Sequence, residues 1–304
     1  MSESNQVRIA IRPKGSTDPW TVLRRTGDAL TLSANTQRSN NVRSDRLRDA
    51  QKVTGLTVGG TVDFEMTASE YDDLIAAAMC STWEADTPSA GTDQIKVGTK
   101  TTQFDVLKSY QDSDEHVLMQ DMEVASLSIN MSAGERITAQ VTFAGGGADY
   151  QYDPSGDTFD SVASAMFFDS SNNLSSITVD GSPLTGTCIT AMSINIDNSH
   201  QQDQCIGSLY QTQHKGSANI TTNKTIRMSS EAFSLWSNMI TNTPVAFSFT
   251  MGDGADSYSF SAPAEYLSGD LPSGGLDAIL SLDLSGALAA DAAGDMLTIE
   301  RTIS

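Results

Sequence analysis

The chain has 304 residues, which is enough for one large β domain or for two domains of ordinary size. It carries 38 acidic and 18 basic residues, and this formal net charge of −20 argues against a protein that binds nucleic acid phosphates over its whole surface. Hydrophobic residues make up 38% of the chain, too many for an acidic disordered polymer, so we expect a folded protein.

No membrane segment and no secretion signal are predicted. The longest apolar run, Leu74 to Cys80, is too short to cross a bilayer. The N-terminal residues lack the apolar centre of a signal peptide, so we expect a protein of the cytoplasm in which it is made. Three cysteines, Cys80, Cys188 and Cys205, are odd in number and have no paired spacing, which predicts buried thiols rather than disulfides or a thiolate metal site.

Charge is distributed unevenly along the chain. Residues 1–52 hold ten basic and five acidic side chains, so the remainder is more acidic than the whole. A basic segment on an acidic body could meet the acidic body of another copy, because complementary potentials steer association. The alternative is that long arginine side chains only keep a loop in solution.

Apolar residues alternate with polar ones over many stretches, which is the pattern of half-buried strands. These stretches run from Leu56 to Met66, from Ile137 to Phe143, from Val245 to Met251, from Leu280 to Leu284 and from Leu297 to Ile303. The sequence therefore predicts a mainly β protein.

Two stretches are predicted to be amphipathic helices, each directly after a strand. In the first, Ser69 is the expected N-cap and Asp72 holds the capping-box position. Its apolar face comprises Tyr71, Leu74, Ile75, Ala78 and Met79. In the second, Ser229 or Ser230 is the expected N-cap. Its apolar face comprises Phe233, Trp236, Met239 and Ile240. We expect both faces to be buried in the core.

The two helices belong to a longer internal repeat. Adding 162 to the residue number carries six apolar residues onto six others: Val58, Phe64, Met66, Tyr71, Leu74 and Ala78 onto Ile220, Ile226, Met228, Phe233, Trp236 and Ile240. Each copy is preceded by an apolar strand and then by a long polar segment. The polar segment comprises residues 33–55 in the first copy and residues 197–216 in the second. Downstream, residues 125–131 resemble residues 279–285.

This repeat predicts two similar β domains, each with one α-helix and one long polar excursion. The domains are expected at residues 1–150 and 176–304, and an acidic linker rich in Gly, Asp and Ser is expected at residues 151–175. The acids of residues 153–160 lack the order of a calcium loop, so this stretch is interpreted as flexible linker.

No enzymatic motif is present. The sequence contains no HExxH, GxSxG or GxxxxGK[ST] pattern, and only three histidines, His116, His200 and His214. His200 and His214 lie in the polar segment of the second copy and are interpreted as solvated loop residues. We therefore predict no catalytic, cofactor-binding or metal-binding residues, no cofactor and no enzymatic activity.

The polar segment of residues 33–55 is the strongest candidate for a functional surface. Loops of this length without structure of their own are uncommon in compact domains and are usually functional or disordered. We prefer an arm that docks on a neighbouring copy, with a mobile exposed loop as the alternative. The candidate contact residues are Arg38, Arg43, Asp45, Arg46, Arg48 and Lys52.

Several motifs resemble the major tail tube proteins of long-tailed bacteriophages with non-contractile tails. They are the element Arg43-Ser44-Asp45-Arg46, the acidic helix start Tyr71-Asp72-Asp73-Leu74 with Trp83 after it, and the stretches LSINMSAGERITAQVTFAGGGA and ITAMSINIDN. The resemblance covers residues 20–304. It implies a tail-tube-like β-sandwich or barrel fold and a virion protein that is assembled in the host cytoplasm. The simplest members carry one such domain in each chain, whereas the repeat predicts two in tandem here.

In such a family, subunits form rings that stack into a hollow tube, and DNA passes through the lumen without specific binding. Because the chain is duplicated, three copies with pseudo-sixfold symmetry are expected in a ring, with six copies as the alternative. The implied partners are the chain itself and tail proteins such as the tape measure, terminator and distal tail proteins. The functional alternative is a β-sandwich adhesion module that binds a glycan or a host surface.

Overall fold

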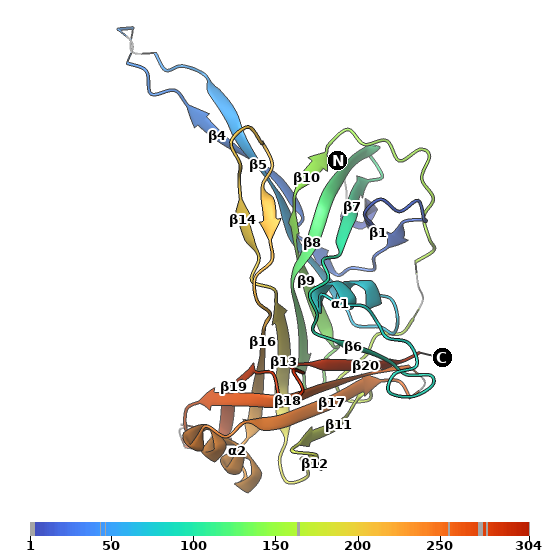
Figure 1. The fold of residues 1–304 in the computed structure, drawn as a ribbon, viewed down its shortest axis with the longest axis vertical. Coiled ribbons are helices and arrows are strands. Elements are labelled where there is room, and N and C mark those ends of the chain that lie inside the picture. The colour runs from blue at the N-terminus through green and yellow to red at the C-terminus, as the bar shows by residue number, and fades with distance from the viewer. Residues whose placement is uncertain are drawn as a thin grey trace.

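The computed structural model describes residues 4–42, 44–45, 47–162, 165–254, 256–272, 276–277 and 279–303. Strands dominate these residues, which contain two α-helices, so the predicted mainly β class with one helix in each half is confirmed. Most strands belong to one continuous sheet of 18 strands, which bends into several layers (Figure 1). Neither helix in these ranges is long and apolar enough to cross a bilayer.

The elements of the first half follow a short 3-10 turn at Ser4–Gln6. They are β1 (Val7–Pro13), β2 (Thr21–Val22), β3 (Gly27–Asp28), β4 (Thr31–Arg38), β5 (Gln51–Glu65), α1 (Asp72–Ala78), β6 (Asp93–Lys96), β7 (Gln103–Tyr110), β8 (Glu115–Ser132), β9 (Thr138–Gly145) and β10 (Gly147–Asp149). The elements of the second half are β11 (Leu174–Val179), β12 (Ser182–Pro183), β13 (Ile189–Asp197), β14 (Gln201–Asp203), β15 (Thr212–His214), β16 (Asn219–Arg227), α2 (Ser230–Thr241), β17 (Val245–Gly252), β18 (Ser257–Gly269), β19 (Ser281–Leu288) and β20 (Thr298–Thr302).

The same antiparallel pairings recur in both halves. In the first half β1 pairs with β2 and β7, β5 with β4 and β9, and β8 with β7, β9 and β10. In the second half β11 pairs with β12 and β17, β16 with β13 and β19, and β18 with β17, β19 and β20. The internal repeat is therefore a repeat of topology, in which β4 corresponds to β13, β8 to β18 and β10 to β20.

One part of the predicted repeat is wrong. Residues 125–131 lie in β8, whereas residues 281–285, in the stretch expected to match them, lie in β19. By its pairing with β16, β19 corresponds to β9 instead. Both stretches alternate apolar and polar residues, and a period of two does not distinguish one strand of a sheet from the next.

The two halves are joined through strands as well as through the chain. Residues Ser126–Ser132 of β8 pair with Ala191–Asp197 of β13, and β20 pairs with β6. The main hydrophobic cluster contains side chains from both halves, among them Ile129 and Ile194. The halves thus share a core, while the boundaries drawn at residues 150 and 176 stay a prediction.

The helix N-termini differ from each other. Ser229 caps α2 as predicted, since its hydroxyl accepts a hydrogen bond from the backbone N–H of Ala232 at 3.1 Å. At α1 the predicted cap is wrong: Tyr71 is the N-cap residue and no side chain caps the helix. Ser69 instead has a left-handed backbone, with φ of 61°, and its N–H donates to the hydroxyl of Tyr258.

The expected burial holds for α1 and only in part for α2. Leu74 and Ile75 are each 1% exposed. On α2 the buried residues are Ala232 and Leu235, one position away from the predicted face. Phe233 of that face is 47% exposed. Trp236 and Met239 of the predicted face are partly buried against a second hydrophobic cluster, so the hydrophobic spacing predicted the helix correctly and its buried side only in part.

The linker of residues 151–175 packs against the first half rather than running free. The backbone N–H of Trp20 donates to the carbonyl of Thr158 at 2.8 Å, and the Arg8 guanidinium carbon lies 3.6 Å from the Phe159 ring centroid. Phe168 is fully buried. The interpretation of residues 153–160 as flexible is therefore wrong, because aromatic residues within the acidic stretch anchor it to the sheet.

The thiol prediction is also wrong in part. Cys80 is buried, and burial raises the pKa of its thiol. Cys188 and Cys205 are exposed, since they lie outside the strands that form the core.

Candidate assembly surfaces

The polar segment of the first half is a long β-hairpin that extends away from the rest of the molecule (Figure 1). Its strands pair from Thr31 with Gly59 to Arg38 with Gln51. Almost every side chain of β4 is exposed. The outer hairpin carries no apolar alternation, so neither of its faces has a core to cover, and it is held by strand pairing alone.

The predicted contact residues gather on this hairpin, henceforth the arm (residues 31–59). Arg38 and Lys52 lie on neighbouring rungs, and Asp45 and Arg48 lie in the connection between the strands. Arg43 and Arg46 lie outside the described residues. Arg38, Arg48 and Lys52 are exposed, and none of them makes an ion pair within the described ranges.

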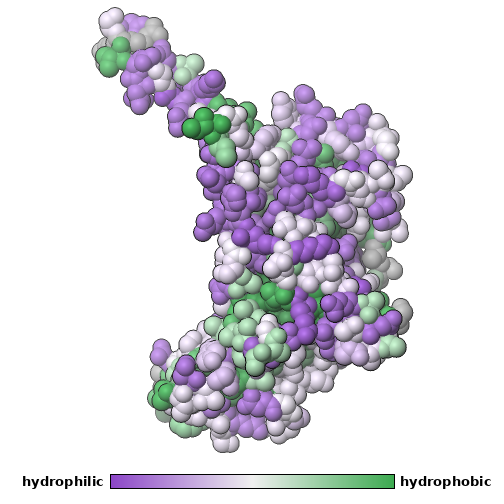
Figure 2. Space-filling view, in the orientation of Figure 1, coloured by the Kyte–Doolittle hydropathy of each residue, from purple (hydrophilic) through white to green (hydrophobic). Residues whose placement is uncertain are grey.

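Apolar side chains are also exposed on the arm. Val42 is fully exposed and Leu47 is 64% exposed at its outer end. Figure 2 shows hydrophobic side chains among hydrophilic ones on this projection. Sequence analysis singled out the charges and missed these two residues, although apolar residues in an otherwise polar loop are a usable signal of a contact surface.

The polar segment of the second half is a smaller hairpin, formed by β14 and β15, that lies beside the arm. The backbone N–H of Leu56 donates to the carbonyl of Leu209 at 2.7 Å, and Leu56 forms a parallel bridge with Tyr210. The amide of Gln204 donates to the carbonyl of Thr54 at 2.9 Å. The equivalent excursions of the two halves are thus bonded to each other at the base of the arm.

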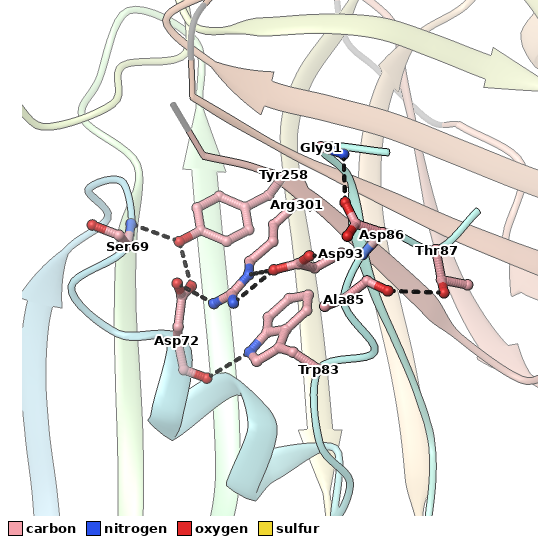
Figure 3. A network of polar contacts seen from close by, with 10 residues as sticks. All are labelled: Ser69, Asp72, Trp83, Ala85, Asp86, Thr87, Gly91, Asp93, Tyr258 and Arg301. Carbon is pink, nitrogen blue, oxygen red and sulfur yellow. Dashed lines mark hydrogen bonds and ion pairs between the residues drawn. The ribbon is translucent and has the colours of Figure 1, made fainter. Parts of the chain in front are cut away.

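A polar network connects α1 to the second half (Figure 3). The Asp72 carboxylate accepts from the Tyr258 hydroxyl at 2.5 Å and from the Arg301 guanidinium at 2.5 Å. Arg301 also donates twice to the Asp93 carboxylate, at 3.0 and 2.8 Å. The network ties α1 and β6 of the first half to β18 and β20 of the second.

The electrostatics of this network favour a fixed geometry. Burial raises the pKa of Asp72, while its bonds to Tyr258 and Arg301 favour the ionised carboxylate. Burial and the adjacent Asp72 raise the pKa of the Tyr258 hydroxyl, which therefore remains a hydrogen-bond donor. Bonds from Arg301 lower the pKa of Asp93. Each of these groups is hydrogen-bonded to another member of the network, which suits a structural junction rather than a reactive centre.

Local sequence patterns do not indicate this junction. They assign Asp72 to a capping position and to the tail-tube resemblance, and they single out neither Tyr258 nor Arg301. The available signal is the presence of charged or hydroxyl groups in otherwise apolar stretches. Arg301 follows the buried Ile299 in β20, and Asp93 precedes the buried Ile95 in β6. Such positions become informative once the pairing of β6 with β20 is known.

The histidines do not share a site. His214 is exposed in β15, as predicted. His200 is not solvated: its side chain is 6% exposed, and its Nε2 lies 3.1 Å from Oε2 of Glu123. The polar segment of the second half folds back over β8, which brings this loop residue into the interior. The side chain of His116 is 11% exposed and lies 3.3 Å from Asp114.

No group of three or more His, Cys, Asp or Glu side chains among the described residues is arranged to hold a metal ion. The prominent features of the molecule are instead a duplicated sheet topology and a projecting hairpin. These features define a mainly β protein with a duplicated strand topology. The sequence profile of the phage tail tube proteins matches residues 4–295, and the chain therefore belongs to that family. No curated protein sequence matches it.

Membership of the family makes the chain a structural component of the phage virion tail. The coarse part of the predicted resemblance is thereby confirmed, whereas the non-contractile subtype stays a prediction. The role of the arm residues in contacts between subunits also stays a prediction.

Proposed function

We propose that this chain forms closed rings that stack into the hollow tube of a non-contractile phage tail, and that DNA passes through the lumen during delivery. Each ring contains three copies with pseudo-sixfold symmetry. The observation that carries the proposal is the recurrence of the same strand pairings in both halves. Two equivalent halves in one chain can fill two positions of a ring, so three chains fill six.

The arm suits contacts between copies. It projects from the body, and Arg38, Arg48 and Lys52 on it are exposed and have no acidic partner within the described part of the chain. The molecule as a whole carries a net charge of −20. A basic projection on an acidic body is complementary to the body of another copy. The exposed Val42 and Leu47 would lose contact with water on docking.

The acidic body also suits a conduit for DNA. Carboxylates repel phosphates, so a lumen with excess acid allows DNA to move without sticking. We further propose that the chain is assembled in the host cytoplasm and that the ends of the tube contact other tail proteins, such as the tape measure, terminator and distal tail proteins.

Charge reversal on the arm tests the role of the arm. The triple variant Arg38→Glu, Arg48→Glu and Lys52→Glu should remain folded, because these side chains are exposed, yet form few tubes in electron micrographs. The matched control, Arg38→Lys, Arg48→Lys and Lys52→Arg, conserves the charge and should assemble like the wild type. Normal tubes from the charge-reversed variant would refute the role of the arm.

A further inference from the structure

The apolar face of α2 is only partly covered, although its counterpart on α1 is buried. Tyr71 and Ala78 are each 1% exposed, whereas Phe233 and Ile240, the residues 162 positions later, are 47% and 66% exposed. The Phe233 and Trp236 rings lie next to each other, with centroids 5.4 Å apart. The space-filling view shows hydrophobic side chains at the end of the molecule where α2 lies (Figure 2).

The two helices are otherwise placed alike. α1 packs against β8, and α2 packs against β18, the counterpart of β8. The difference between them comes from the other half of the chain. Tyr258 of β18 and Arg301 of β20 bond to Asp72 at the start of α1, and the amide of Asn198 donates to the carbonyl of Ala78 at its end. The second half thus covers α1, and nothing in the described part of the chain covers α2 in the same way.

The two halves also differ in the pairing of one strand edge. β13 is paired on both edges, with β16 on one side and with β8 on the other. Its counterpart β4 pairs only with β5 in the described residues. At the other end, Tyr266–Gly269 of β18 pair with β19 alone. The contact that joins the halves within the chain, β8 to β13, therefore has an unused counterpart, β18 to β4.

We infer that the second half of each copy binds the first half of the next copy through a repeat of the internal junction. The exposed side chains of α2, Phe233 and Ile240, pack against the β8 and β10 region of that neighbour, which corresponds to β18 and β20. The end of β18 lies beside the free edge of the neighbour's β4. The occupant of both open surfaces is a second copy of this chain. This inference rests on the proposed ring and specifies its interface.

A head-to-tail interface of this kind uses two different surfaces and closes into a ring when the rotation between copies permits. The charges at the strand contact also differ. β4 belongs to residues 1–52, which hold ten basic and five acidic side chains, whereas residues 176–304 hold four basic and thirteen acidic ones. Attraction at this end of the interface favours the contact of β18 with β4 over a contact between two second halves.

Substitutions on α2 test the helix contact. The double variant Phe233→Asp and Ile240→Asp should weaken association between copies at least tenfold, measured by sedimentation or native mass spectrometry. The control, Ser234→Asp and Thr241→Asp, adds the same charge at the same spacing on the neighbouring face and should associate like the wild type. Circular dichroism establishes that both variants are folded.

The direction of the contact is tested by cross-linking. A photoreactive benzoylphenylalanine at position 233, in rings assembled from a mixture of isotope-labelled and unlabelled chains, should form links between chains to residues 1–150. Links between chains to residues 176–304, or rings of the Phe233→Asp and Ile240→Asp variant as stable as those of the wild type, would overturn the inference. In both cases the proposed ring would stand. If wild-type protein formed no rings under any assembly condition, the proposed function would be refuted, and with it the interface that rests on it.

Discussion

Side chains on the apolar faces of the two helices have different surroundings, and their contributions to stability should differ accordingly. Leu74 is 1% exposed in the shared core, while Ile240 is 66% exposed. Leu74→Ala removes buried methyl groups and leaves a cavity, so it should lower the free energy of unfolding by about 2 to 5 kcal/mol. Ile240→Ala, as the control, should change the stability of the monomer by less than about 0.5 kcal/mol. Denaturant titration measures both, and equal effects would mean that the two faces are equally buried.

The junction between the halves depends on the hydroxyl of Tyr258. It donates to Asp72 and accepts from the N–H of Ser69, and both contacts are shielded from water. Tyr258→Phe keeps the ring and removes the hydroxyl, so it should cost about 1 to 3 kcal/mol by leaving buried groups unpaired. Tyr266→Phe, at a side chain that is 39% exposed, is the control and should be neutral. An unchanged denaturation midpoint for Tyr258→Phe would exclude an energetic role for this hydroxyl.

The pair of Glu123 and His200 predicts a specific dependence on pH. Burial alone would raise the pKa of Glu123, but hydrogen bonds from His200 and Gln103 outweigh it, and the pKa lies below its ordinary value of 4.5. The folded state therefore favours the carboxylate. This contribution is present above about pH 4.5 and is lost as the pH falls through the folded-state pKa.

Glu123→Gln should consequently lower stability near pH 7 and make the loss of stability in acid less steep. Unfolding free energies measured from about pH 3 to pH 7 test this expectation. Glu115→Gln, at an exposed position of the same strand, is the control. Parallel curves for the wild type and Glu123→Gln would show that this carboxyl binds protons equally in both states.

At the scale of elements, hydrophobic spacing predicted the helices and many strands. It did not predict whether other parts of the chain cover their apolar faces. The spacing of Phe233, Trp236 and Ile240 resembles that of Tyr71, Leu74 and Ala78. The sequence of α2 does not indicate that Phe233 and Ile240 are exposed. Burial of α1 depends on Tyr258, Arg301 and Asn198, which are distant in sequence. Local periodicity reports which side of an element is apolar, and tertiary contacts decide whether that side is covered.

The arm illustrates the same limit. The length and charge of residues 33–55 predicted an excursion with a function, yet a hairpin was not foreseen, because its strands lack the apolar alternation used to recognise them. β4 and β5 are held by their backbone hydrogen bonds and by continuity with the sheet below. Only knowledge of the partner strand β9 identifies β5 as a single long strand.

The shared core predicts cooperative unfolding of the two halves. β8 pairs with β13, and one hydrophobic cluster contains residues of both halves. Calorimetry of the monomer should therefore give one transition, with calorimetric and van't Hoff enthalpies that agree. Two separate transitions, or a fragment of residues 1–150 that unfolds cooperatively by itself, would show that the halves are independent domains.

At the scale of the whole molecule, the main feature is the duplication of the sheet topology. Its halves have the same pairings, one junction between them is complete, and one equivalent set of surfaces is open. A ring closes when every open surface meets its complement on the next copy, and every copy then contributes two quasi-equivalent positions. Contacts within the chain and contacts between chains alternate around such a ring.

The mass of the ring tests this central claim most directly. One chain has a mass of 32.3 kDa, so a ring of three copies has a mass of about 97 kDa and a ring of six about 194 kDa. Native mass spectrometry of rings released from assembled tubes should find the three-copy mass, and averaged images should show threefold symmetry with a sixfold outline. A six-copy mass with true sixfold symmetry would contradict the account.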